Sequence, residues 1–148
     1  MTPVIVKIIA GTIATLAFAI LFKVKAKLLP YATFGGFVAC IIYFILIDTV
    51  GGAFIPNVVS AFIVALLSEV FARVKKAPST VFLFPGCIAL VPGGTLYYTM
   101  NSLLSKNYNE AFHYFLTTLT VGIAIGGGII AASLVIYLTT KAYNKFTK

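Results

Sequence analysis

Residues 82–94 read FLFPGCIALVPGG, an apolar stretch with two Pro-Gly pairs, Pro85-Gly86 and Pro92-Gly93. Proline removes a backbone donor and clashes with the preceding helical turn, and glycine loosens the chain. Such breaks are costly in an apolar environment, because hydrocarbon offers no partner to a free backbone group. The stretch therefore raises the question of what surrounds it, which the composition of the whole chain answers.

The 148-residue chain is 61% hydrophobic and only 9% charged, whereas a soluble domain carries about 25% charged residues. Too few polar residues are present to cover a soluble surface, so the composition predicts an integral membrane protein in a lipid bilayer. The net charge of +8 is typical of a membrane protein with Lys and Arg in its cytoplasmic loops. Because basic and aromatic residues do not interleave, we expect no nucleic-acid partner.

Apolar runs of about 20 residues predict membrane-spanning helices. The loops between such runs are too short for a separate soluble domain. We therefore predict one transmembrane domain over residues 1–148, an all-α polytopic half-transporter whose fourth span is broken by both Pro-Gly pairs. The five predicted transmembrane helices cover residues 4–22, 31–47, 53–72, 79–100 and 112–138.

Basic residues flank these spans unevenly. Five alternating spans place nine of them on one side and only Lys7 and Lys106 on the other. Because Lys and Arg gather in cytoplasmic loops, we predict an N-terminus outside and a C-terminus inside, in a bacterial cytoplasmic (inner) membrane. The nine are Lys23, Lys25, Lys27, Arg73, Lys75, Lys76, Lys141, Lys145 and Lys148.

Small residues recur every four positions in several spans, which lets helix backbones approach closely in lipid. In the fifth span, Gly122, Gly126 and Gly127 predict such a contact, either ordinary packing within the bundle or a surface that faces another subunit. The first and second spans carry matching sets, namely Gly11, Thr15 and Ala19, and Ala32, Gly36 and Cys40.

Groups for catalysis are scarce, with one His and three acidic residues. We expect no enzyme, no cofactor and no metal site, because no base lies near a nucleophile and no ligand set has metal spacing. Glu69 lies within a span, four residues before Arg73, so it is either a structural ion pair or a proton carrier. Asn57 either lines a cavity or bonds a neighbouring backbone carbonyl.

The centre of the fourth span falls between the two Pro-Gly pairs. Interrupted helices near the membrane midplane present free amides and carbonyls to substrates in many secondary transporters. A half-helix that begins at Pro92 suits a carboxylate at its N-terminus. The alternative is a merely kinked helix. The predicted substrate path comprises Pro85, Gly86, Pro92, Gly93, Gly94, Thr95 and Tyr97.

The run from Pro78 to Met100, with its LVPG segment and following Tyr97, resembles the signature of the threonine/serine exporter family. More closely, the chain is similar to the small five-span subunit that some bacteria make separately. The resemblance implies export of threonine and serine, or of dicarboxylates such as succinate. It also implies a larger partner subunit with a membrane half and a cytoplasmic region, and hence a hetero-oligomer. A departure from the pattern is Ala89, where the resemblance implies proline.

The sequence therefore predicts a subunit of a secondary-active exporter of small carboxylate metabolites. Two half-transporters of opposite orientation would work by alternating access, driven by an ion gradient, since no GxxxxGK nucleotide loop occurs. The alternative is a non-transporting subunit that only assembles or stabilises a membrane complex.

Overall fold

The computed structural model describes residues 2–146, with side chains over residues 4–142. Lys145 and Lys148, counted above with the basic side, lie outside the described side chains. Within the described chain every regular element is a helix and no strand occurs, as the sequence predicts. The elements are α1 (Thr2–Leu21), the short 3-10 helix η1 (Ala26–Leu28), α2 (Leu29–Val50), α3 (Phe54–Lys75), α4 (Thr80–Ile88), α5 (Gly93–Leu104) and α6 (Tyr108–Phe146).

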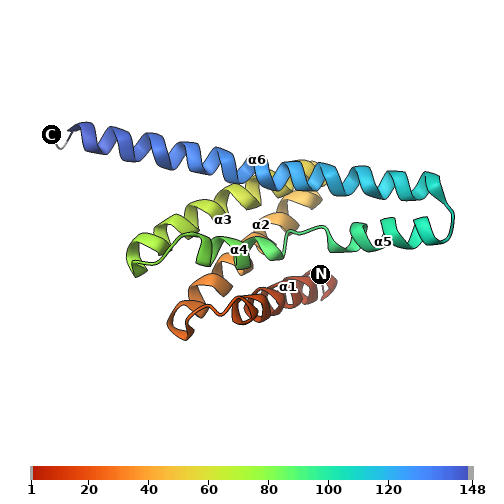
Figure 1. The fold of residues 1–148 in the computed structure, drawn as a ribbon, viewed down its shortest axis with the longest axis horizontal. Helices are drawn as coiled ribbons and strands as arrows, with labels where there is room; N and C mark the ends of the chain where they lie inside the picture. Colours follow the sequence, from red (N-terminus) through yellow and green to blue (C-terminus); the bar gives the residue numbers. More distant parts are fainter. Residues whose placement is uncertain (1, 147–148) are drawn as a thin grey trace.

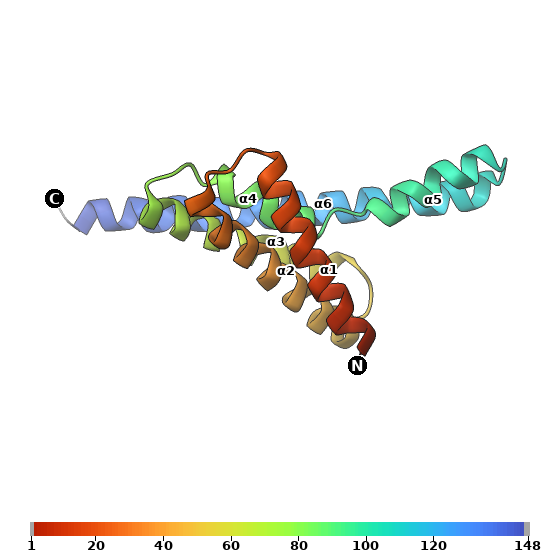
Figure 2. The same ribbon diagram turned by 90° about the horizontal axis from the view of Figure 1, so that it is seen from below.

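Four helices, α1, α2, α3 and α6, are each long and apolar enough to cross a membrane. The helices α4 and α5 pass the same test only together, and they are bent by 54° at the break between them. The chain thus has four candidate spans, or five if the bent pair crosses as one. Helix α6 runs along the long axis of the molecule with α5 beside it, whereas α1 and α2 run obliquely to this axis (Figures 1 and 2).

The prediction that both Pro-Gly pairs break the fourth span is wrong for the first pair. Helix α4 continues through Pro85 and Gly86 to Ile88. A methyl group on Gly86 would lie 2.8 Å from Cγ1 of Val64 on α3. The first pair therefore lies within a helix that packs closely against α3. Of the two pairs, only Pro92-Gly93 lies at a break.

The small residues of α1 and α2 face one another, as their spacing predicts. A side chain on Gly36 would overlap Thr15, and one on Gly11 would overlap the Cys40 thiol. Thr15, Ala19 and Ala32 are fully buried. The antiparallel pairs are Gly11 with Cys40, Thr15 with Gly36, and Ala19 with Ala32.

Helix α6 packs along α3 and, at its other end, along α5. With 39 residues it is about 58 Å long, nearly twice the hydrocarbon thickness of about 30 Å. The α5–α6 hairpin extends past the ends of α1, α2 and α3 (Figures 1 and 2). The molecule is therefore a short body, made of α1 to α4 and the part of α6 that packs along α3, with an arm made of α5 and the rest of α6.

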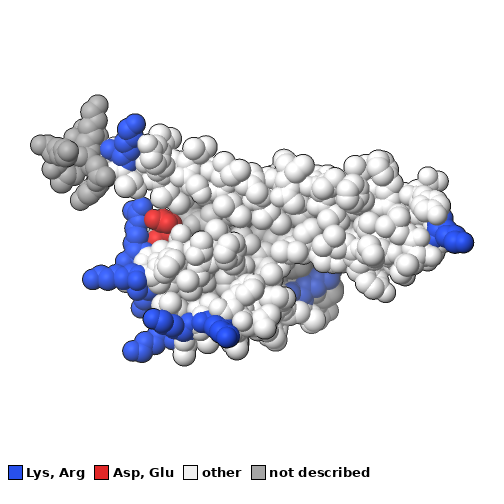
Figure 3. Space-filling model, in the orientation of Figure 1, with Lys and Arg blue, Asp and Glu red and all other residues white. Residues whose placement is uncertain are grey.

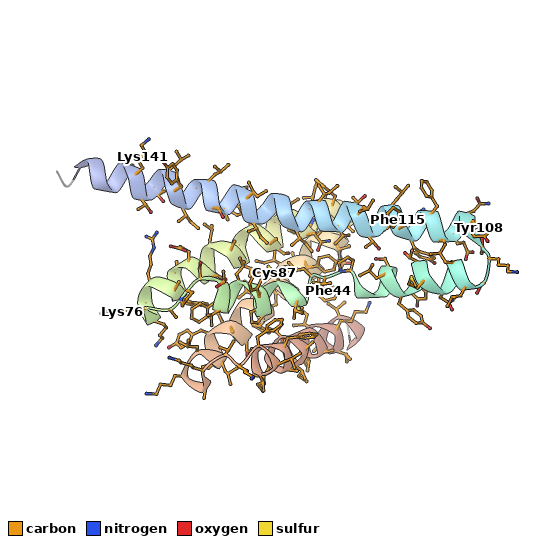
Figure 4. The ribbon with its side chains drawn as sticks, viewed as in Figure 1. Phe44, Lys76, Cys87, Tyr108, Phe115 and Lys141 are labelled. Atoms are coloured by element: carbon orange, nitrogen blue, oxygen red, sulfur yellow. The ribbon has the colours of Figure 1, made fainter. Side chains whose placement is uncertain are left out.

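Basic side chains gather at the end of the molecule opposite the arm (Figure 3). Lys76 and Lys141 lie at this end, whereas Tyr108 lies at the tip of the arm (Figure 4). The loops after α1 and after α3 both reach the same end (Figure 1). The loops after α1 and α3, which the sequence places on one side because of their basic residues, thus lie at the same end of the molecule.

Candidate functional site

The break between α4 and α5 borders a cavity of about 260 Å³. This volume is just below the range of about 300 to 1,000 Å³ typical of drug-sized ligands, and it suits a small metabolite. Four segments build the wall: α2, the start of α3, the break with the first turn of α5, and α6. The lining residues are Tyr43, Ala53, Asn57, residues 89–95, Thr117 and Val121.

The backbone at the break carries unpaired groups of both polarities. Within the described chain, no backbone carbonyl accepts from the amides of Gly94 and Thr95, and no side chain caps the start of α5. These amides and the positive end of the α5 dipole favour a carboxylate. In the same described part, no N–H donates to the carbonyls of Ala89 and Leu90. The cavity therefore has a donor side and an acceptor side.

Asn57 adds a buried polar group to this wall. Its side chain is only 2% exposed. The Nδ2 group donates to the carbonyl of Ala53 at 2.6 Å. Asn57 therefore both lines a cavity and bonds a neighbouring backbone carbonyl, the two alternatives considered from the sequence. Among the described residues, its Oδ1 atom has no hydrogen-bond partner. An unpaired buried acceptor costs about 1–3 kcal/mol, which a ligand with an N–H or O–H donor would offset.

Threonine hydroxyls fix the first turn of α5 beside the cavity. The Thr95 hydroxyl donates to the carbonyl of Pro92 at 3.0 Å. The Thr118 hydroxyl on α6 donates to Thr95 Oγ1 at 2.8 Å, and the Thr99 hydroxyl donates to the Thr95 carbonyl at 2.7 Å. The turn that presents the free amides is therefore held by side chains of both α5 and α6.

The structure separates the predicted substrate-path residues into four places. Pro92, Gly93, Gly94 and Thr95 line the cavity. Pro85 lines a different cavity near the basic end, and Gly86 packs against α3. The Tyr97 side chain lies outside the lining and is 66% exposed.

Sequence reasoning missed the cavity residues that come from α2 and α6. These are Tyr43, Thr117 and Val121, which lie far from the Pro-Gly pairs in the sequence. No motif marks them, because their role depends on which faces of α2 and α6 turn toward the break. Asn57 was the one signal available from α3, as a polar residue early in an apolar span.

Glu69 forms an ion pair with Arg73, with Nε and Oε1 3.1 Å apart. Arg73 also donates through Nη2 to the Thr140 hydroxyl of α6, at 3.1 Å. The structural pair considered from the sequence is therefore present, and it links α3 to α6. A proton-carrying role for Glu69 stays a prediction, which the pH dependence of efflux in a Glu69→Gln variant would test.

The α6 glycines behave differently from one another. A side chain on Gly122, Gly126 or Gly127 would meet no atom within 4 Å. A side chain on Gly128 would overlap the Val58 carbonyl of α3. Gly128 is therefore the contact within the chain, and an intersubunit role for the other three stays a prediction.

The fold and the cavity define a multi-pass helical membrane protein with a small polar site at an interrupted helix, an arrangement found in secondary transporters. Among the described residues, no group of three or more His, Cys, Asp or Glu could hold a metal ion. The model of a family described as Threonine/Serine exporter, ThrE, matches residues 7–135, so the chain belongs to this exporter family. No curated protein and no solved structure matches the chain.

Proposed function

We propose that the chain is one half of a secondary-active exporter of small amino acids such as threonine and serine. The observation that carries this proposal is the cavity at the break, which has free amides on one side and free acceptors on the other. A zwitterion matches both sides: its carboxylate suits Gly94 and Thr95, and its ammonium suits Asn57 Oδ1 and the carbonyls of Ala89 and Leu90.

Dicarboxylates such as succinate fit this cavity less well. No Lys, Arg or His occurs among its lining residues. A second carboxylate would therefore face carbonyl and amide oxygens without a compensating cation, which disfavours it in a low-dielectric environment. The cavity supports amino acids over dicarboxylates as the substrate class.

The half-transporter would act with a larger membrane subunit of the same family. If this chain runs from outside to inside and its partner runs in the opposite sense, the two form an inverted pair with the substrate site between them. The gathering of basic side chains at one end of the molecule supports the orientation with that end in the cytoplasm (Figure 3). Movement of the halves about the break would give alternating access in a bacterial inner membrane.

Efflux from cells loaded with threonine or serine tests this proposal. Pro92→Ala restores a backbone donor at the break and allows α4 and α5 to join into one helix. Export should then fall at least tenfold, which corresponds to a loss of about 1.4 kcal/mol. Pro85→Ala is the matched control, because α4 is already helical at this position. Deletion of the chain that leaves efflux unchanged, with the partner intact, would overturn the transport role.

A non-transporting assembly subunit is the second candidate, favoured by the open surface at Gly122, Gly126 and Gly127. It differs in its expected results. Pro92→Ala would then leave efflux unchanged, whereas a bulky residue at Gly126 would abolish the complex and efflux together.

A further inference from the structure

A second cavity, of about 390 Å³, lies at the basic end of the molecule. It is bordered by the loop that follows α1, by η1, by the loop between α3 and α4, and by α4. None of its lining residues belongs to the cavity at the break. The site is therefore separate from the proposed transport site, and its chemistry needs its own explanation.

Three lysines, Lys23, Lys25 and Lys76, line this cavity. No acidic residue occurs in the lining to neutralise them. The nearby carboxylate of Glu69 is already paired with Arg73. The cavity thus concentrates positive charge that is available to an anion.

Two of these lysines occupy unusual backbone positions. Lys23 and Lys76 have φ angles of 55° and 50° and end α1 and α3 in the same left-handed cap. Amides that follow the two helices bond back to the carbonyls of Ala19 and Ala72, at 3.0 and 3.1 Å. Glycine is the usual residue in such caps. The helix dipoles favour a cation there, and the two caps bring both lysines to one cavity.

Apart from Thr80, the rest of the wall is apolar. Phe22, just after α1, and Phe84, within α4, line the cavity with the lysines and are 50% and 62% exposed. A ligand that uses the whole cavity must therefore carry an anionic group beside a hydrocarbon part. The apolar residues in the lining are Phe22, Val24, Leu28, Ala77, Pro78, Val81, Phe84 and Pro85.

We propose that this cavity binds an anionic phospholipid. The phosphate headgroup lies against Lys23, Lys25 and Lys76, and an acyl chain follows Phe22 and Phe84 into the bilayer. Basic pockets between transmembrane helices at the cytoplasmic side are known to hold such headgroups. The lipid joins the end of α1 to the start of α4, the helix whose far end forms the break.

Binding of phosphatidylglycerol to the full chain in neutral detergent tests this proposal, measured by native mass spectrometry and by the shift in unfolding temperature. Replacing all three lysines (Lys23→Gln, Lys25→Gln and Lys76→Gln) should weaken binding on the order of a hundredfold. A matched variant, with Lys27→Gln, Lys75→Gln and Lys141→Gln, removes the same charge from the basic end outside the cavity lining and should bind like the wild type. Lys25→Gln alone, which leaves both left-handed caps intact, should weaken binding about fivefold.

Three results would overturn the proposal. Equal binding of phosphatidylcholine would show that the site does not recognise the charge of the headgroup. Equal loss in the matched variant would show a general attraction to the basic end. Displacement of phosphatidylglycerol by millimolar inorganic phosphate would show a site for a soluble anion. None of these results depends on whether the chain transports amino acids.

Discussion

Asn57 carries an unpaired buried acceptor, which is energetically costly, and the same acceptor has the proposed role of binding the substrate ammonium. Its side chain is almost fully buried, yet one of its two polar atoms lacks a partner among the described residues. The bond from Nδ2 to the Ala53 carbonyl fixes the amide. The Oδ1 acceptor is consequently held in one position on the cavity wall, ready for an ammonium group.

Replacing Asn57 should weaken substrate binding. Asn57→Leu keeps most of the volume but removes the acceptor, so the apparent affinity for the exported amino acid should fall about tenfold or more. Concentration-dependent efflux from membrane vesicles measures this. Ser68→Ala is the control, because Ser68 is buried on the same helix but lies outside the cavity lining. Equal losses in the two variants would indicate damage to the packing of α3 rather than to the site.

At the scale of elements, α1 and α2 are held together by close backbone approach. Burial of apolar surface gives little attraction between helices in lipid, so small residues have to supply contact instead. Thr15 fills the space that Gly36 leaves open. The neighbouring Gly35 has no atom within 4 Å of where its side chain would start, although both glycines are buried.

This difference between adjacent glycines leads to a test of the α1–α2 contact. Gly36→Ala should lower the free energy of unfolding by about 1–3 kcal/mol, because the added methyl group overlaps Thr15. Gly35→Ala should have a much smaller effect. Unfolding in detergent by heat or by SDS measures both changes. Adding Thr15→Gly to Gly36→Ala should recover most of the loss, and failure to recover it would contradict the contact.

The two Pro-Gly pairs show how packing decides the conformation of an element. Both have the same covalent chemistry, but Gly86 is held against Val64 of α3 inside a continuous helix. Pro92 has φ and ψ of −78° and 58°, which is not helical, and it stands at the start of α5. The first pair therefore shapes the surface of α4, whereas the second forms the break.

At the scale of the whole molecule, the chain has features of a component of a larger assembly. The arm formed by α5 and the adjoining part of α6 extends from the body of the molecule (Figure 2). Along α6, no atom lies within 4 Å of where a side chain on Gly122 or Gly126 would start. These features support the proposed partner subunit, which would cover this side of α6.

Glycines of α6 allow the partner surface to be tested separately from the fold. Gly126→Leu should leave the unfolding temperature of the chain nearly unchanged, because no atom lies within 4 Å of the new Cβ. It should strongly reduce co-purification with the partner. Gly128→Ala should do the opposite and destabilise the chain by about 1–3 kcal/mol, because its methyl overlaps the Val58 carbonyl. Normal co-purification of Gly126→Leu would contradict a partner surface at this position.

The sequence by itself determined the helical membrane class, the asymmetric placement of basic loops, the contact faces of α1 and α2, and a break at Pro92. These features follow from local chemistry. Hydropathy determines which segments enter the membrane, and the charge of each loop can be counted from the loop itself. Small residues at a spacing of four lie on one face of a helix, whatever that face packs against.

Only the tertiary structure decided which residues meet at the break, that α4 passes unbroken through Pro85, and that Gly128 rather than Gly126 contacts α3. Each of these depends on how a helix is rotated about its axis. One residue of shift turns a side chain by about 100°, since a turn holds 3.6 residues. The packing of several helices at once sets that rotation, so the partners of the break lie beyond any local pattern in the sequence.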